Sequence, residues 1–177
     1  MTNNLAIGPT AAVNHSLALL RAAAFEIAVE PRLPLVPGIV LATDPAAVVL
    51  GTVTSRPGEM LSLHLMPQGP VRWVSLTLDL GWIDFGALDL LGIVCRTRAP
   101  RAVTMVVHLR TALEGGNVDV AFRKSVVAYA EPSLHMDAFD FSRDLGVPRG
   151  MAKREVVVMF EHTDFAVDLL NFSVFVA

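Results

Sequence analysis

The chain has 177 residues, of which 53% are hydrophobic and 18% are charged. This composition excludes intrinsic disorder, because a chain so rich in apolar residues and so poor in charge collapses in water. The net charge of −3 also argues against a nucleic-acid partner, which normally requires a basic face. We expect one domain over residues 1–177, large enough to bury about 70% of the surface that the unfolded chain exposes.

The N-terminal stretch from Met1 to Leu20 carries no charge, but Gly8, Pro9 and three asparagines interrupt it. It also lacks a basic start, so we expect neither a membrane span nor a secretory signal. The single cysteine, Cys95, has no partner for an internal disulfide and lies between apolar neighbours. We therefore expect a cytoplasmic protein in which Cys95 is buried as a small hydrophobic residue.

The first element has two interpretations. Asn14 can cap a short helix that runs to about Ala24, with Leu17 and Leu20 at helical spacing. The alternative is an irregular arm over residues 1–24 that leads into the first strand.

From Phe25 onward, short runs of β-branched and apolar residues alternate with turn signals rich in Gly, Pro and Asp. A short turn is also expected around Ser142–Val147. The predicted strands are Phe25–Glu30, Ile39–Ala42, Val48–Thr54, Met60–Met66, Val71–Leu80, Leu90–Arg98, Ala102–Arg110, Val118–Arg123, Ser125–Ala130, Leu134–Asp140, Arg154–His162 and Asn171–Val176.

This strand pattern predicts an all-β fold, an antiparallel β-sandwich. In Val71–Leu80, alternation points Val74, Leu76, Leu78 and Leu80 to one face, and Trp73, Ser75, Thr77 and Asp79 to the other. By contrast, Val156–Phe160 is apolar on both faces, which indicates cover by a loop, a helix or another subunit. The high overall hydrophobicity favours the last option, so we predict a homo-oligomer.

The order of features from Trp73 onward resembles the jelly-roll modules of the galactose-binding-like and carbohydrate-binding class. Four segments carry this resemblance, namely Trp73–Asp84, Val103–Arg110, Gly116–Phe122 and Asp168–Val176. The resemblance implies a jelly-roll fold and saccharide binding through aromatic side chains. Many such modules hold a structural calcium ion, but this sequence has no matched acidic cluster at the chain ends, and we expect no cofactor.

Four basic side chains form the first candidate ligand site. Alternation places two of them on one face of Leu90–Arg98 and two on one face of Ala102–Arg110. If these consecutive strands pair through the turn at 99–101, all four line one surface suited to a carboxylate, a phosphate or an acidic sugar, because arginine offers a bidentate fork. The alternative is a solvated face with local ion pairs. The four residues are Arg96, Arg98, His108 and Arg110.

The two tryptophans are the best candidates for a saccharide or partner contact. Trp73 lies on the polar face of its strand, and Trp82 lies in an aromatic, acidic loop. Packing in the core or an interface is the competing interpretation.

Two histidine segments offer weak metal candidates. His135 and Asp137 alternate onto one face, and His162 and Asp164 follow the Val-rich strand. A metal site requires these two groups to converge. Nothing in the sequence shows that convergence, so we predict no metal.

No nucleotide-binding, hydrolase or zinc motif is present. The preferred function is a non-catalytic binding or accessory module that recognises a saccharide or a protein. The alternatives are an oligomeric assembly module and a metal-assisted β-sandwich enzyme.

Overall fold

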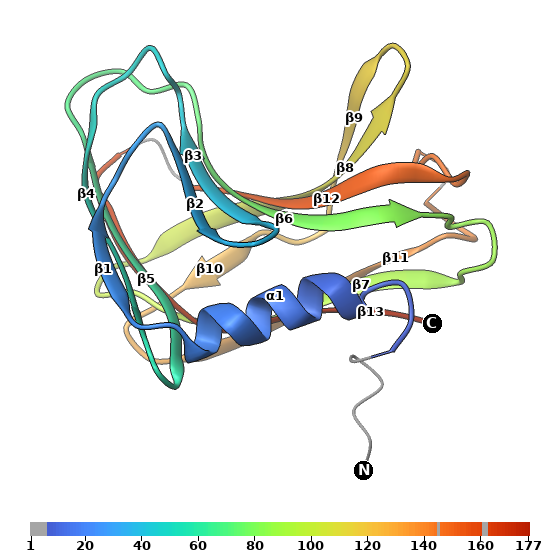
Figure 1. The fold of residues 1–177 in the computed structure, drawn as a ribbon, viewed down its shortest axis with the longest axis horizontal. Helices are drawn as coiled ribbons and strands as arrows, with labels where there is room; N and C mark the ends of the chain where they lie inside the picture. The colour runs from blue at the N-terminus through green and yellow to red at the C-terminus, as the bar shows by residue number, and fades with distance from the viewer. Residues whose placement is uncertain (1–6, 145, 161–162) are drawn as a thin grey trace.

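Two antiparallel sheets face each other in the computed structural model, which describes residues 7–144, 146–160 and 163–177 (Figure 1). The six-stranded sheet has the order β1 (Phe25–Ala28), β4 (Val49–Arg56), β5 (Glu59–Pro67), β13 (Phe165–Val176), β7 (Leu90–Arg98) and β11 (Ser133–Asp140). The seven-stranded sheet has the order β10 (Val126–Ala128), β8 (Val103–Leu113), β12 (Ala152–Met159), β6 (Val74–Ile83), β3 (Ile39–Thr43) and β2 (Arg32–Val36), with β9 (Gly116–Ala121) paired to β8. The predicted antiparallel β-sandwich is confirmed.

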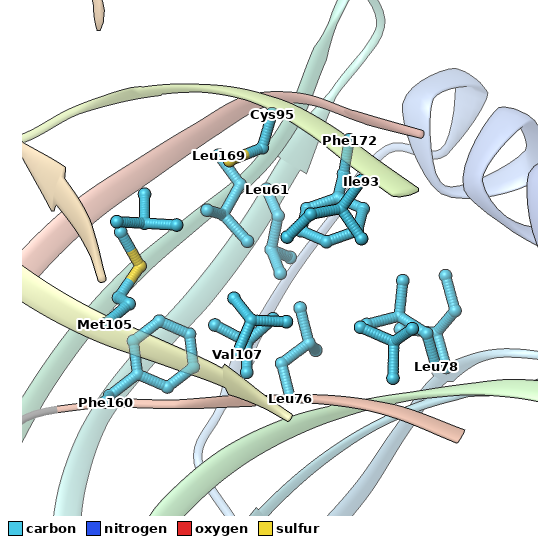
Figure 2. Close-up of a cluster of buried hydrophobic side chains, with 14 of the residues drawn as sticks. Leu61, Leu76, Leu78, Ile93, Cys95, Met105, Val107, Phe160, Leu169 and Phe172 are labelled. Atoms are coloured by element: carbon cyan, nitrogen blue, oxygen red, sulfur yellow. The ribbon is translucent and has the colours of Figure 1, made fainter. Parts of the chain in front are cut away.

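The core lies between the two sheets and is built by the alternation of their strands. In Figure 2, Ile93, Cys95 and Leu169 of the six-stranded sheet face Leu76 and Val107 of the seven-stranded sheet. The prediction that Cys95 is buried is confirmed, and burial raises the pKa of its thiol to about 12. The thiol therefore stays protonated at neutral pH and packs as an apolar group.

The N-terminal segment is a helix, α1 (Ala11–Ala22), which contacts strands of both sheets and closes one side of the sandwich. The expected cap at Asn14 is wrong, because the helix begins three residues earlier. Asn14 instead bonds to the backbone of Val174, donating to its carbonyl at 2.7 Å and accepting from its N–H at 3.1 Å. β5 pairs with β13 only as far as Leu169, so this side-chain amide replaces a neighbouring strand on the remaining edge. No helix in the described part of the chain has the length and apolar character needed to cross a membrane.

Two strand predictions need correction. β2 was not expected, because Pro34 interrupts its pattern, but β2 is an edge strand, where the missing N–H of proline is tolerated. β13 begins at Phe165 rather than Asn171, because a register shift between Leu169 and Asn171 breaks the alternation.

Over Val156–Val158, strand β12 is apolar on both faces, which led us to expect that another subunit covers its outer face. The isolated chain already buries this part of the strand. Val156 and Val158 face the core, and Val157 faces outward beside Thr77 and His108. Val157 is nevertheless 1% exposed within the isolated chain. This position therefore needs no second subunit to be buried, and homo-oligomerisation stays a prediction.

Consecutive strands β7 and β8 lie in different sheets. β7 pairs with β13 and β11, whereas β8 pairs with β12, β10 and β9. The turn between them crosses from one sheet to the other, so the predicted pairing of these two strands is wrong.

Candidate functional site

The outer face of the seven-stranded sheet is hollowed by a groove of about 530 Å³. In Figure 1 the β8–β9 hairpin rises from the sheet at one end of this face, on the side away from α1. The groove is lined by side chains of β2, β3, β6, β12 and β8, by Gly38 in the turn between β2 and β3, and by Trp73 just before β6. These residues are Arg32, Gly38, Val40, Ala42, Trp73, Ser75, Thr77, Asp79, Arg110, Lys153, Glu155 and Met159.

Strand register orders the floor of the groove into three rows, since residues paired across antiparallel strands point to the same face. The first row is Arg32, Ala42, Ser75, Met159 and Val106; the second is Val40, Thr77, Val157 and His108; the third is Asp79, Glu155, Arg110 and Asp119. The first two rows are mostly small or apolar, and the third is fully charged. A bound molecule therefore meets an apolar side and a hydrogen-bonding side.

A bulge in β6 brings Trp82 onto the groove face. Strict alternation from Val74 would aim Trp82 at the core. The register shifts by one residue opposite Arg154 and Glu155, and Gly81 adopts a φ of +79°, which favours glycine. Trp82 consequently pairs with the groove residue Lys153 and is 72% exposed. Nothing in the alternation pattern predicts this bulge.

Trp73 lies at the other end of β6, where a buried carboxylate holds the preceding residue. Asp44 accepts two hydrogen bonds from the Arg72 guanidinium, at 2.7 and 2.8 Å, and a third from the Ala46 N–H at 3.0 Å. These bonds hold the pKa of the Asp44 carboxyl well below its usual range. The Asp44 N–H also donates to the Trp73 carbonyl at 3.0 Å, so this network fixes the backbone at Trp73.

The charged row is internally paired. Arg110 donates two hydrogen bonds to Asp119, at 2.8 and 2.7 Å, and its guanidinium lies 4.0 Å from Glu155. Lys153 lies 3.4 Å from Asp79. Next to this row, burial lowers the pKa of His108, which favours the neutral form of this imidazole. The centre of the groove therefore offers polar side chains with little excess charge.

Below the Trp82 end, the fully buried Arg154 anchors the bulge from the core side. It donates hydrogen bonds to the Ile83 carbonyl (3.2 Å), to the Thr111 hydroxyl (2.7 Å) and to the Gly150 carbonyl (2.6 Å). Its guanidinium lies 3.8 Å from the centre of the Phe85 ring. Burial lowers the pKa of Arg154, and these acceptors and the ring compensate the buried charge.

The four basic residues predicted to share one surface are divided between opposite faces. His108 and Arg110 face the groove side, whereas Arg96 and Arg98 lie on the outer face of the six-stranded sheet. The fork of Arg98 is occupied by Asp168, with hydrogen bonds of 3.0 and 2.6 Å. The two predicted tryptophans, in contrast, do share the groove face.

The metal candidates do not come together in the described chain. His135 and Asp137 share a face as predicted, but the Asp137 oxygens accept the backbone N–H groups of Lys124 and Ala138. Asp164 is exposed before β13, and His162 lies outside the described residues. Within residues 7–144, 146–160 and 163–177, no three His, Cys, Asp or Glu side chains gather in a way that would hold a metal ion.

Several groove residues were not among the candidates predicted from the sequence. The alternation of polar residues along their strands nevertheless indicated some of them. Alternation had already placed Ser75, Thr77 and Asp79 beside Trp73. The same alternation in β12 places Lys153 and Glu155 on one face. Arg32 was missed because its strand was missed.

No family model and no curated protein matches the chain. Solved structures with a similar fold include the N-terminal cellulose-binding domain of Cellulomonas fimi β-1,4-glucanase C, at 13% identity and a TM-score of 0.54 over 79% of this chain and 89% of that chain. The CBM22-1 xylan-binding domain of Paenibacillus barcinonensis Xyn10C is 9% identical, with a TM-score of 0.50 over 86% of this chain and 92% of that chain. A CBM4 structure is 14% identical, with a TM-score of 0.50 over 78% and 87% of the two chains. These likenesses confirm the predicted resemblance to carbohydrate-binding modules at the level of the fold, a jelly-roll β-sandwich.

Proposed function

We propose that the protein is a non-catalytic module that binds a polysaccharide chain along the groove of the seven-stranded sheet. The observation that carries this proposal is the placement of Trp73 and Trp82 at the two ends of β6, on the same outer face. At about 3.3 Å per residue the two indoles are roughly 25–30 Å apart, which spans several consecutive sugar rings. Between them the floor presents hydroxyl, carboxylate and ammonium groups.

This arrangement matches the surface chemistry of a sugar ring. A pyranose has faces of C–H groups, which pack on an indole, and an equator of hydroxyl groups, which need donors and acceptors. Trp73 is half-buried and held by the Asp44–Arg72 network, so it is already positioned for stacking. The charged row supplies acceptors from Asp79 and Glu155 and a donor from Arg110, and the neighbouring Lys153 supplies a second donor.

The carboxylates of the groove favour binding over hydrolysis. Asp79 and Glu155 are register partners on one sheet face, and each has a cation beside it, Lys153 for Asp79 and Arg110 for Glu155. A glycosidase instead needs one carboxyl group that is free to donate a proton to the leaving oxygen. The saccharides named for the structural neighbours, cellulose and xylan, support a glycan as the ligand class.

The test is affinity electrophoresis and titration calorimetry with soluble cellulose derivatives, mixed-linkage β-glucan, xylan and an α-glucan as comparison. We expect binding of at least one β-linked chain, and a loss of about tenfold or more in affinity for Trp73→Ala, because a stacked aromatic contributes about 0.5–1.5 kcal/mol in addition to the apolar area that it buries. Trp82→Ala should weaken the binding of long chains more than that of short oligosaccharides.

Leu134→Ala is the matched control, because Leu134 is an exposed apolar side chain on the opposite outer face. It should leave affinity unchanged. Urea unfolding of each variant shows that lost binding is not lost folding. Absence of binding to every polysaccharide, or equal losses for Leu134→Ala and Trp73→Ala, would refute the proposal.

A further inference from the structure

One arginine at the groove has a free guanidinium. The fork of Arg110 is occupied by Asp119 and that of Arg72 by Asp44. Arg32 also lines the groove, but its side chain makes no hydrogen bond or ion pair within residues 7–144, 146–160 and 163–177. The exposed Glu30, two residues earlier in the chain, forms no ion pair with it in this part of the structure either.

Arg32 lies at the Trp73 end of the groove. Arg32 pairs with Ala42 on β3, and Ala42 pairs with Ser75 on β6. Two strand spacings, about 10 Å, therefore separate Arg32 from Ser75, and only the methyl group of Ala42 lies between them. The long arginine side chain can extend over Ala42, and Trp73 precedes Ser75 by two residues on the same face.

The two ends of the groove differ in charge. At the Trp73 end lie Arg32, whose side chain is unpaired in the described chain, and the exposed Arg72, which is paired with Asp44. At the Trp82 end, Lys153 is paired with Asp79, and Asp84 is exposed nearby in the chain. An anionic substituent on a bound chain is therefore favoured at the Trp73 end over the Trp82 end.

We infer that the groove recognises an acidic polysaccharide, and that Arg32 binds the carboxylate of a uronate unit next to the sugar ring stacked on Trp73. The inference rests on the proposed polysaccharide-binding function and specifies its ligand class. A guanidinium is suited to this role because its parallel N–H groups match the two oxygens of a carboxylate. The neighbouring indole excludes water from one side of the contact, which strengthens the charged hydrogen bonds.

The experiment compares uronate polysaccharides with the same chains after reduction of their carboxyl groups to alcohols. Alginate, polygalacturonate and glucuronoxylan are each titrated in both forms at low and high salt. We expect at least one acidic form to bind about tenfold tighter than its reduced counterpart at low salt, the lower end of the range for hydrogen bonds to a charged group. This preference should shrink in 0.5 M NaCl, where exposed charges are screened.

Variants test whether Arg32 causes the preference for acidic chains. Arg32→Gln should abolish the difference between acidic and reduced chains, because the acidic chain loses the contact to its carboxylate. Arg32→Lys should retain part of the preference through charge alone. Arg96→Gln, an exposed arginine on the opposite face, is the matched control and should keep the full preference.

The outcomes separate this inference from the proposed function. Equal binding of acidic and reduced chains, or an acid preference that survives Arg32→Gln, overturns the inference and leaves the Trp73-dependent groove intact. A sulfated glycan that binds in an Arg32-dependent manner while every uronate chain fails overturns the carboxylate assignment. If no polysaccharide binds at all, both proposals fail together.

Discussion

The two outer faces of the sandwich carry similar ion pairs but differ in shape. Each face has an arginine whose fork is held by an aspartate on a neighbouring strand, Arg110 with Asp119 on one face and Arg98 with Asp168 on the other. The face with Arg110 is hollowed into the groove. Charge alone therefore does not distinguish a candidate binding face from an ordinary solvated one in this protein.

The difference in shape comes from side-chain volume. In the groove, the central strands present Ala42, Ser75 and Thr77. On the other face, Phe175 of β13 lies directly over Gly92 of β7, where a Cβ atom would lie 2.1 Å from the phenyl ring. An aromatic ring thus fills one sheet surface where small side chains leave the other surface open.

The largest predicted effect concerns Arg154, which supports the groove face from below. Arg154→Ala removes three hydrogen bonds from buried or partly buried acceptors and leaves a cavity beside Phe85. We expect the free energy of unfolding to fall by about 3 kcal/mol or more. Urea denaturation measures this loss. Arg96→Ala, with an exposed arginine on the other face, should change it by less than about 0.5 kcal/mol. Equal stability of the two variants would show that Arg154 is not an anchor.

The next effect tests whether the Phe175 ring fills the outer face of the six-stranded sheet. Gly92→Ala forces the new methyl group into the Phe175 ring, and we expect a loss of about 1–2 kcal/mol in the free energy of unfolding. Because the clash involves one partner, the double variant with Phe175→Ala should lose less than the sum of the two single variants. Strict additivity in chemical denaturation would contradict the proposed contact.

A third effect is a pH dependence of the protein's stability that originates at the Trp73 end of the groove. The pKa of Asp44 is lowered in the folded protein by Arg72, so its contribution to stability is complete above the ordinary carboxyl pKa of 3.8 and is lost as the pH falls below it. Asp44→Asn removes this contribution. Its melting temperature should therefore fall less than that of the wild type between pH 5 and pH 2. Parallel curves for the two proteins would exclude Asp44 as a source of the acid sensitivity.

Much of the fold could be predicted from the sequence, because alternation is a local property. The alternate facing of the side chains from Trp73 to Leu80 follows directly from the residue order, and most strand positions were correct. Which sheet a strand joins could not be predicted, because this depends on contacts between distant parts of the chain. The turn after Arg98 crosses between sheets, and nothing in Ala99-Pro100-Arg101 distinguishes that crossing from a hairpin turn.

The candidate site was predictable only in part, for related reasons. Trp73 and its polar neighbours were found by alternation. The return of Trp82 to the same face depends on a one-residue bulge at Gly81, and a one-residue shift reverses every facing after it. Arg32 lies on a proline-containing edge strand, whose pattern resembles a loop.

The smallest effects return to the two matched ion pairs and separate stability from function. Both pairs are partly exposed, so Arg98→Ala and Arg110→Ala should each lower the free energy of unfolding by about 0.5 kcal/mol or less. Binding should distinguish them, because Arg110 lines the groove and lies beside Glu155. Arg110→Ala removes a donor and leaves Glu155 without its nearest cation, so affinity for a bound polysaccharide should fall several-fold, whereas Arg98→Ala should bind as the wild type does. Calorimetric titration of the two variants decides this point. If both lose affinity to the same extent, the groove is not where the ligand binds, because the only property that the two arginines share is a paired charge on a sheet surface.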